Sequence, residues 1–144
     1  MARVLIPLAP GCEELEAVTL IDLLRRAQIE VVAAGLAPGP VKGSRGTVLL
    51  PDSTLDAVRQ QDFDMIVLPG GQPGATNLEH DARILALLKK MAAAGKFTAA
   101  ICAAPRVLAV AGLLDGKHAT SYPGALATQQ FPTIRLEARA VVRD

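Results

Sequence analysis

Residues 97–105 read Phe-Thr-Ala-Ala-Ile-Cys-Ala-Ala-Pro, an apolar segment of β type that ends abruptly at Cys102. A helical pattern follows over residues 106–112. The first N–H groups of a helix are unpaired and its dipole is positive there, so a thiol at this turn is expected to be stabilised as thiolate. A reactive side chain at a sharp strand-to-helix turn is the arrangement of a nucleophile elbow. Taken alone, the stretch fits a nucleophilic Cys102 and an inert buried cysteine equally well.

Two further apolar runs end in residues that carry chemistry. Residues 63–68 run into Pro-Gly-Gly at 69–71, and such a strand end exposes backbone N–H groups to a ligand, as in an oxyanion hole. Residues 3–8 run into the acidic segment 11–16, Gly-Cys-Glu-Glu-Leu-Glu. Ligands of open α/β sheets bind at the carboxyl ends of the strands. We therefore predict that a thiol, a glycine pair and carboxylates meet at one sheet edge.

The rest of the chain alternates strand and helix patterns, which predicts a mostly parallel sheet with right-handed crossovers. Periodicity and turn residues predict helices over 13–28, 51–61 (beginning after Asp52 or Ser53) and 81–94, strands over 29–36, within 113–122 and over 138–143, and a hairpin over 41–50.

Composition limits the classes of protein and partner. The 144 residues are 51% hydrophobic and 3% aromatic, which predicts one domain over 1–144 with an aliphatic core. A net charge of +1 and the lack of a basic and aromatic cluster argue against nucleic-acid binding. The apolar runs are short and the N-terminus enters a strand directly, so we expect no membrane association and a cytoplasmic location.

The remaining cysteine and the histidines are weaker candidates. Because we expect a cytoplasmic location, the two cysteines are expected to be free thiols and not a structural disulfide. Cys12 is either a small turn residue without a role or a resolving thiol, the latter only if its Cα lies within about 7 Å of that of Cys102. His80 is expected to be solvated. No spacing of His, Cys, Asp and Glu suggests a zinc site, and we expect no metal or cofactor.

Five short motifs, in this order along the chain, resemble those of a known family. The chain resembles the ThiJ/PfpI superfamily, in the branch of the parkinsonism-associated DJ protein and the bacterial YajL-type proteins, closely up to residue 123 and more loosely beyond. The resemblance is carried by GCEELE at 11–16, DLLRRA at 22–27, SRG at 44–46, VLPGG at 67–71 and AICAAP at 100–105. It implies a flavodoxin-like, three-layer α/β sandwich and a homodimer.

The resemblance also implies roles for single residues. The residues carried over are a reactive cysteine, a glutamate hydrogen-bonded to its sulfur, three donors of backbone N–H groups and two arginines on an anion-attracting rim near the dimer interface: Cys102; Glu16; Gly70, Gly71 and Ala103; Arg26 and Arg45. Without the resemblance, the acidic residues at 13–16 would simply complement a helix dipole and the arginines would be solvated.

The chain departs from the family at three points. The protease-like branch has a histidine directly after the nucleophilic cysteine, where this chain has Ala103, and the DJ branch takes one from a later strand, where this chain has Tyr122, a secondary candidate. His118 lies about 13 Å from position 122 along an extended strand, so we do not expect His118 to take the role of the family histidine. Family members also continue past the position of Asp144 with a loop and a long helix, so we expect a truncated chain without that C-terminal element.

Two functions stay open. In the first, a redox-responsive, chaperone-like protein protects client proteins against oxidative and carbonyl stress, with Cys102 oxidised to sulfenic and then sulfinic acid. In the second, a glyoxalase or protein deglycase acts on methylglyoxal or its adducts: Cys102 attacks the aldehyde carbon, backbone N–H groups hold the oxyanion and Glu16 moves the proton. Without a histidine as general base, turnover would depend on Glu16 alone, so we place the protective function slightly ahead of the enzyme. The same lack of a histidine argues against peptidase activity.

Overall fold

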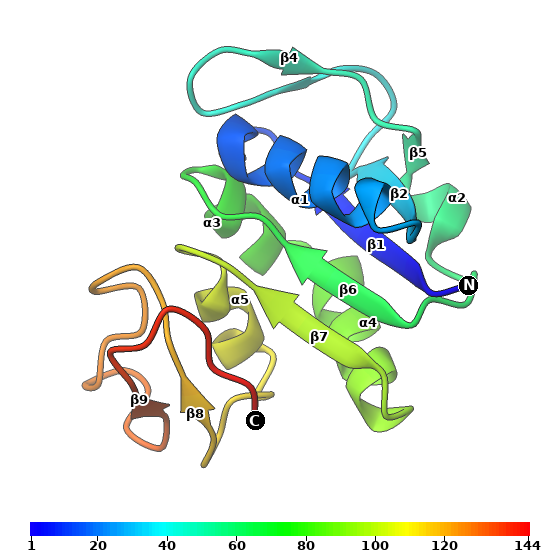
Figure 1. The fold of residues 1–144 in the computed structure, drawn as a ribbon. Coiled ribbons are helices and arrows are strands. Elements are labelled where there is room, and N and C mark those ends of the chain that lie inside the picture. Colours follow the sequence, from blue (N-terminus) through cyan, green and yellow to red (C-terminus); the bar gives the residue numbers. More distant parts are fainter.

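Five parallel strands form the central sheet of the structure, a computed structural model that describes residues 1–144 (Figure 1). Their order is β5-β2-β1-β6-β7. The strands are β1 (Arg3–Leu8), β2 (Glu30–Gly35), β5 (Ser53–Thr54), β6 (Met65–Leu68) and β7 (Phe97–Ala100). The three long strands in the middle are aliphatic and almost wholly buried, as expected of a parallel sheet covered on both faces.

Helices cover both faces of this sheet (Figure 1). They are α1 (Glu14–Arg26), α2 (Leu55–Val58), α3 (Gly74–Glu79), α4 (Ala82–Ala93) and α5 (Pro105–Val110). Side chains of β1 alternate between two cores: Ile6 packs in the cluster that contains Ala17 of α1, whereas Leu5 packs in the larger cluster formed with the other four helices. The layering is that of the flavodoxin-like sandwich that the family resemblance implied.

Two small sheets flank the main one. β3 (Val41–Lys42) and β4 (Val48–Leu49) pair antiparallel in the predicted hairpin. β8 (His118–Ala119) and β9 (Arg135–Leu136) pair in parallel and belong to a C-terminal lobe beside α5 and β7 (Figure 1). This lobe has its own core of four buried residues: Ala109, Ala119, Leu126 and Ile134. None of the helices has the length and apolar character needed to cross a lipid bilayer.

Most predicted elements are confirmed, and three differ. No strand forms over 138–143; β9 lies earlier, where it pairs with β8. The helix within 51–61 is shorter than predicted and is capped by Thr54, because the carboxylate of Asp52 instead accepts hydrogen bonds from the N–H of Ala33 and from Arg25. Helix α3 was not predicted, since its small and polar residues show no apolar period.

Candidate functional site

The candidate site lies where the chain reverses its direction of winding across the sheet. From β1 the chain continues through α1 to β2 on one side, and from β6 through α3 and α4 to β7 on the other. Such a switch point leaves a crevice at the carboxyl ends of the two adjacent strands. The segments after β1 and β6 meet in this crevice, because the N–H of Glu13 donates to the carbonyl of Gly70.

Cys102 occupies a strained turn directly after β7. Its φ is +58°, in the left-handed region that residues with a side chain rarely adopt, at an energy of about 1–3 kcal/mol. The carbonyl of Cys102 accepts the N–H of Tyr122 at 2.7 Å, and the turn is closed by a bond from Ala104 N–H to Ile101 O. The side chain is partly exposed. The turn has the geometry of the predicted nucleophile elbow.

Glu16 reaches this elbow from the first turn of α1. Its Oε1 accepts the N–H of Gly70 at 2.9 Å. A Cβ at Gly70 would lie 2.7 Å from both Glu16 Oε1 and Cys102 Cβ, so the two side chains meet across a position that only glycine can fill. The N–H of Gly70 was expected to donate to an oxyanion, and in the structure Glu16 accepts it.

Two other backbone N–H groups surround the sulfur. Those of Gly71 and Ala103 have no backbone acceptor, and both stabilise a thiolate at Cys102. Gly71 has a φ of +84°, and a Cβ there would lie 2.4 Å from the N of Glu13. The segment after β1, which contains Glu13, therefore approaches so closely that position 71 requires glycine. These two N–H groups, with Glu16 beside them, are the polar groups of the candidate pocket at the sulfur.

The pKa of the Cys102 thiol is raised above its ordinary value. Burial is the main cause, followed by the charge of Glu16 and its hydrogen bonding with the thiol, whereas the N–H groups of Ala103 and Gly71 act in the opposite direction. The helix N-terminus was expected to favour the thiolate, but burial and the charge of Glu16 outweigh the N–H groups at this turn.

A second carboxylate, that of Glu14, organises the neighbouring hairpin. It is buried and accepts the backbone N–H groups of Arg45 and Thr47, both at 3.0 Å, and the hydroxyl of Ser44. Burial acts to raise the pKa of Glu14, but hydrogen bonds from its own N–H, from Thr47, from Arg45 and from Ser44 together lower it to about 2. Sequence reasoning gave Glu14 no role beyond the helix dipole, since its partners are some thirty residues away.

The two predicted rim arginines lie far apart on this chain. Arg26 is exposed at the last turn of α1, where it pairs with Asp22. Ten residues of helix separate it from Glu16, about 15 Å. Arg45 lies in the hairpin loop that Glu14 fixes next to the first turn of α1, and its side chain is exposed. Within one chain, only Arg45 lies near the elbow end of α1.

The secondary candidates lie outside the pocket. Cys12 is 1% exposed in the core under α1, and burial together with the charge of Glu14 raises its pKa to about 11. Tyr122 is 63% exposed and contacts the elbow through its backbone N–H. His118 pairs with Glu137, and His80 is exposed. No three metal-ligating side chains cluster.

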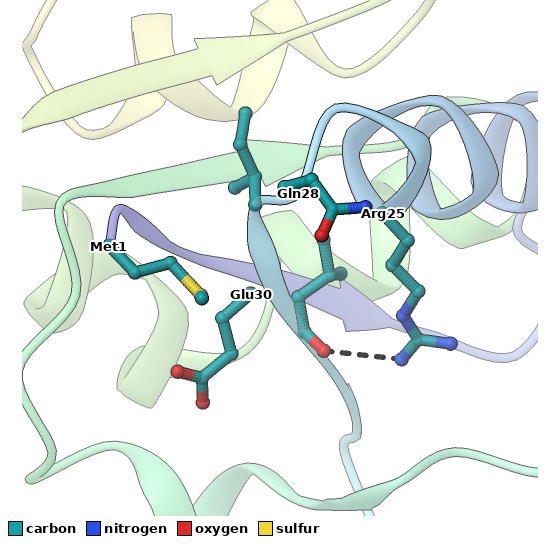
Figure 2. A pocket seen from close by; sticks show the side chains of 6 residues that line it. Met1, Arg25, Gln28 and Glu30 are labelled. Atoms are coloured by element: carbon teal, nitrogen blue, oxygen red, sulfur yellow. Dashed lines mark hydrogen bonds between the residues drawn. The ribbon is translucent and has the colours of Figure 1, made fainter.

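An open groove of the surface lies elsewhere. It has a volume of about 310 Å³ and lies at the amino ends of β1 and β2, the edge of the sheet opposite to Cys102 (Figure 2). Its lining residues are Met1, Arg25, Gln28, Ile29, Glu30 and Val31. Arg25 spans it by donating to the carbonyl of Val31 at 3.1 Å. The groove carries no cysteine, serine or histidine, so the elbow remains the candidate site.

The chain is similar to known proteins in sequence and in fold. The model of the DJ-1/PfpI family matches residues 2–144. Protein dj-1beta of Drosophila melanogaster is 47% identical over 120 residues, which are 83% of this chain and 64% of that protein. The Parkinson disease protein 7 homolog of Danio rerio is 43% identical over 125 residues, 85% of this chain and 66% of that protein. The chain thus spans about two thirds of the length of these relatives.

Other similarities concern activity and structure. A Caenorhabditis elegans protein named glutathione-independent glyoxalase DJR-1.2 is 37% identical over 121 residues, 84% of this chain and 64% of that protein. The crystal structure of Drosophila melanogaster DJ-1beta superposes with a TM-score of 0.93 at 40% identity, over 99% of this chain and 77% of that one. Oxidized Toxoplasma gondii DJ-1 gives a TM-score of 0.88 at 40% identity, over 99% and 78%.

Proposed function

The chain belongs to the DJ-1/PfpI family, and from this premise we propose that it protects client proteins against oxidative and carbonyl stress, with Cys102 as its reactive group. One observation carries the proposal: the strained cysteine lies between the Glu16 carboxyl and the two unpaired N–H groups of Gly71 and Ala103. Preorganised donors of this kind stabilise negative charge that develops beside them.

The redox chemistry needs a peroxide as oxidant. The Cys102 thiolate attacks one oxygen of hydrogen peroxide, the O–O bond breaks, and the departing hydroxide takes up a proton to leave as water, which gives a sulfenic acid. A second peroxide adds a second oxygen and releases a second water, which gives a sulfinic acid. The N–H groups of Gly71 and Ala103 would donate to one sulfinate oxygen. Glu16, held by Gly70 through Oε1, would donate a proton on Oε2 to the other.

The proposed function is tested by treating the protein with hydrogen peroxide and following both cysteine-containing peptides by mass spectrometry. We expect Cys102 to gain two oxygens while Cys12 stays reduced. Suppression of the aggregation of a heat-denatured client should then differ between the reduced and oxidised wild type, and Cys102→Ser should not respond to peroxide. Oxidation of Cys12 ahead of Cys102, or a wild type that responds no more than Cys102→Ser, would refute the proposal.

A glyoxalase activity is the second candidate, favoured by the worm relative named as a glutathione-independent glyoxalase. The Cys102 thiolate would add to the aldehyde carbon of methylglyoxal, with the oxyanion held by Gly71 and Ala103. Glu16 would move a proton from that carbon to its neighbour, and hydrolysis of the resulting thioester would release lactate and restore the thiol. Glu16 is the only nearby base, so we expect slow turnover. Lactate formation by the wild type, absent from Cys102→Ser, distinguishes this activity from oxidation alone.

We also propose that the chain works as a homodimer in the cytoplasm. The outer face of α1 exposes large apolar side chains, Leu15 and Val18 among them, and Val48 and Leu50 of the hairpin region are exposed as well. A soluble helix normally turns such residues inward, and a second copy of the chain would cover them. Both cysteines are free, which suits a reducing compartment.

A further inference from the structure

Arg106, in the first turn of α5, contacts parts of the structure that lie far apart in the sequence. Its Nε lies 2.7 Å from Glu79 Oε1 at the end of α3. Its Nη1 donates to Gln130 Oε1 at 2.8 Å, and the guanidinium lies 5.4 Å from the centre of the Phe131 ring. A single side chain thus ties α3 and α5 to the segment 122–131 of the C-terminal lobe, which lies beside α5 in Figure 1.

The contact with Glu79 holds the guanidinium in place. The Glu79 side chain is only 12% exposed, and its Oε1 is buried without a well-aligned hydrogen-bond donor, so the interaction with Arg106 is an ion pair rather than a linear hydrogen bond. The only other partner of the carboxylate is the exposed His80, 3.4 Å away. A buried carboxylate without a counter-charge is unfavourable, so Glu79 fixes Arg106 between the helices.

The segment 122–131 begins at the elbow. The N–H of Tyr122, at its start, donates to the carbonyl of Cys102. The segment contains no helix or strand. Its internal backbone hydrogen bonds are local turns, from Ala125 N–H to Tyr122 O and from the N–H groups of Gln130 and Phe131 to Ala127 O. Its position therefore depends on side-chain contacts with α5, which are the apolar cluster around Ala109 and the contacts of Arg106.

We infer that Arg106 is a positioning residue that holds segment 122–131 against the elbow and thereby limits the size of molecule that reaches the Cys102 sulfur. The inference rests on the proposed role of Cys102 as the reactive group. The guanidinium suits the task because its planar fork can face a carboxylate, an amide and an aromatic ring at once. A lysine would keep the charge opposite Glu79 but would lose the contact with Gln130 or Phe131.

The test compares two maleimides that share one reaction and differ in size. The Cys102 peptide is quantified by mass spectrometry after reaction with N-methylmaleimide or N-pyrenylmaleimide. Since both reagents use the same thiolate, the ratio of the bulky to the small rate does not depend on the pKa of the thiol. We expect the ratio to rise about tenfold in Arg106→Ala, the change that the loss of about 1.4 kcal/mol produces in an opening equilibrium. Arg106→Lys should give a smaller rise.

Gln130→Ala removes only the contact on the side of the segment and leaves the ion pair with Glu79 intact. Gln130 is exposed, so this variant should fold, and the ratio should rise in the same direction. Arg25→Ala is the matched control, because it removes an ion pair with Asp52 at the far end of the sheet and should leave the ratio unchanged. Buried Cys12 reports global opening and should stay unlabelled throughout.

The outcomes separate this inference from the proposed function. Unchanged ratios in both Arg106→Ala and Gln130→Ala would overturn the role of Arg106, as would labelling of Cys12 that rises together with that of Cys102, since the molecule would then open as a whole. Maleimide access is measured without peroxide or methylglyoxal. A wild type that resists both of these compounds would refute the proposed function while the size ratios still decide the role of Arg106.

Discussion

Glu16 Oε1 accepts the N–H of Gly70 at 2.9 Å, and this bond fixes the carboxyl beside the elbow cysteine. The two glycines therefore have different roles. The N–H of Gly70 orients the Glu16 carboxyl, and the N–H of Gly71 remains free to donate to an anion. Both functions proposed for the chain use these two roles, because each needs a proton held at one point and a negative charge stabilised at another.

Gly70→Ala should separate the acid from the thiol. The new Cβ would lie 2.7 Å from both Glu16 Oε1 and Cys102 Cβ, so one of the two side chains must move. We expect at least a tenfold slower conversion of sulfenic to sulfinic acid, the effect of losing about 1.4 kcal/mol of stabilisation. Gly39→Ala is the control. Its φ of +97° means that alanine strains the backbone there as well, but the new Cβ meets no other atom and lies outside the site. Equal oxidation rates for the two variants would contradict the prediction.

Glu16→Gln and Glu16→Leu should differ in their oxidation products. The amide of glutamine accepts from Gly70 and still donates to a sulfinate oxygen, whereas leucine does neither. We expect Glu16→Leu to slow the step beyond sulfenic acid by an amount that corresponds to one charge-assisted hydrogen bond, about 1.5–3 kcal/mol. Mass spectrometry after timed exposure to peroxide measures the two products. The same rate in wild type and Glu16→Leu would show that the carboxyl does not contact the oxidised sulfur.

The alkylation of Cys102 should be slow at neutral pH and should accelerate as the pH rises. Burial and the charge of Glu16 raise the pKa of the thiol, so little thiolate is present at pH 7. Glu16→Gln removes the charge and should lower that pKa, which gives faster alkylation by iodoacetamide at pH 7 than in the wild type. Cys12 should react later than Cys102 in both proteins. A rate that is independent of pH between 7 and 9 would contradict the raised pKa.

The buried Cys12 thiol makes the stability of the fold depend on alkaline pH. Its pKa rises from an ordinary 9.0 to about 11 in the native state, so the unfolded chain loses this proton first as the pH rises. The stabilisation is complete below pH 9 and is lost between pH 9 and 11, by about 1.4 kcal/mol for each pH unit. Urea unfolding at several pH values should show this fall in the wild type. The fall should be smaller in Cys12→Ala, and parallel curves for the two proteins would exclude Cys12 as its source.

The sequence predicted that three segments meet because strand ends are local features. The apolar runs that end at Cys102, at the glycine pair and at the acidic segment all belong to parallel strands, whose carboxyl ends share one edge. Which N–H group of the glycine pair faces a side chain depends on backbone angles that the sequence does not reveal. The family resemblance supplied the pairing of Glu16 with Cys102, which no periodicity predicts.

Long-range polar contacts account for what the sequence missed. The carboxylate of Glu14 is buried by a hairpin loop some thirty residues away, and the guanidinium of Arg106 pairs with Glu79 and Gln130. Neither contact leaves a periodic pattern. The strand predicted over 138–143 failed for a related reason: alternation marks a segment that is able to pair, but the partner of β8 is the short segment Arg135–Leu136.

The exposed face of α1 gives the prediction on assembly. Val18 is 47% exposed at the middle of that face, with the still more exposed Leu15 one turn earlier. If a second copy covers this face, Val18→Lys places a charge in an apolar interface, which an unpaired ammonium strongly disfavours. We expect light scattering to show a dimer for the wild type and a monomer for this variant. Leu136→Lys, on an exposed apolar residue of the C-terminal lobe, should remain dimeric. A wild type that stays monomeric at high concentration, or a Val18→Lys variant that remains a dimer, would show that this face of α1 does not mediate self-association.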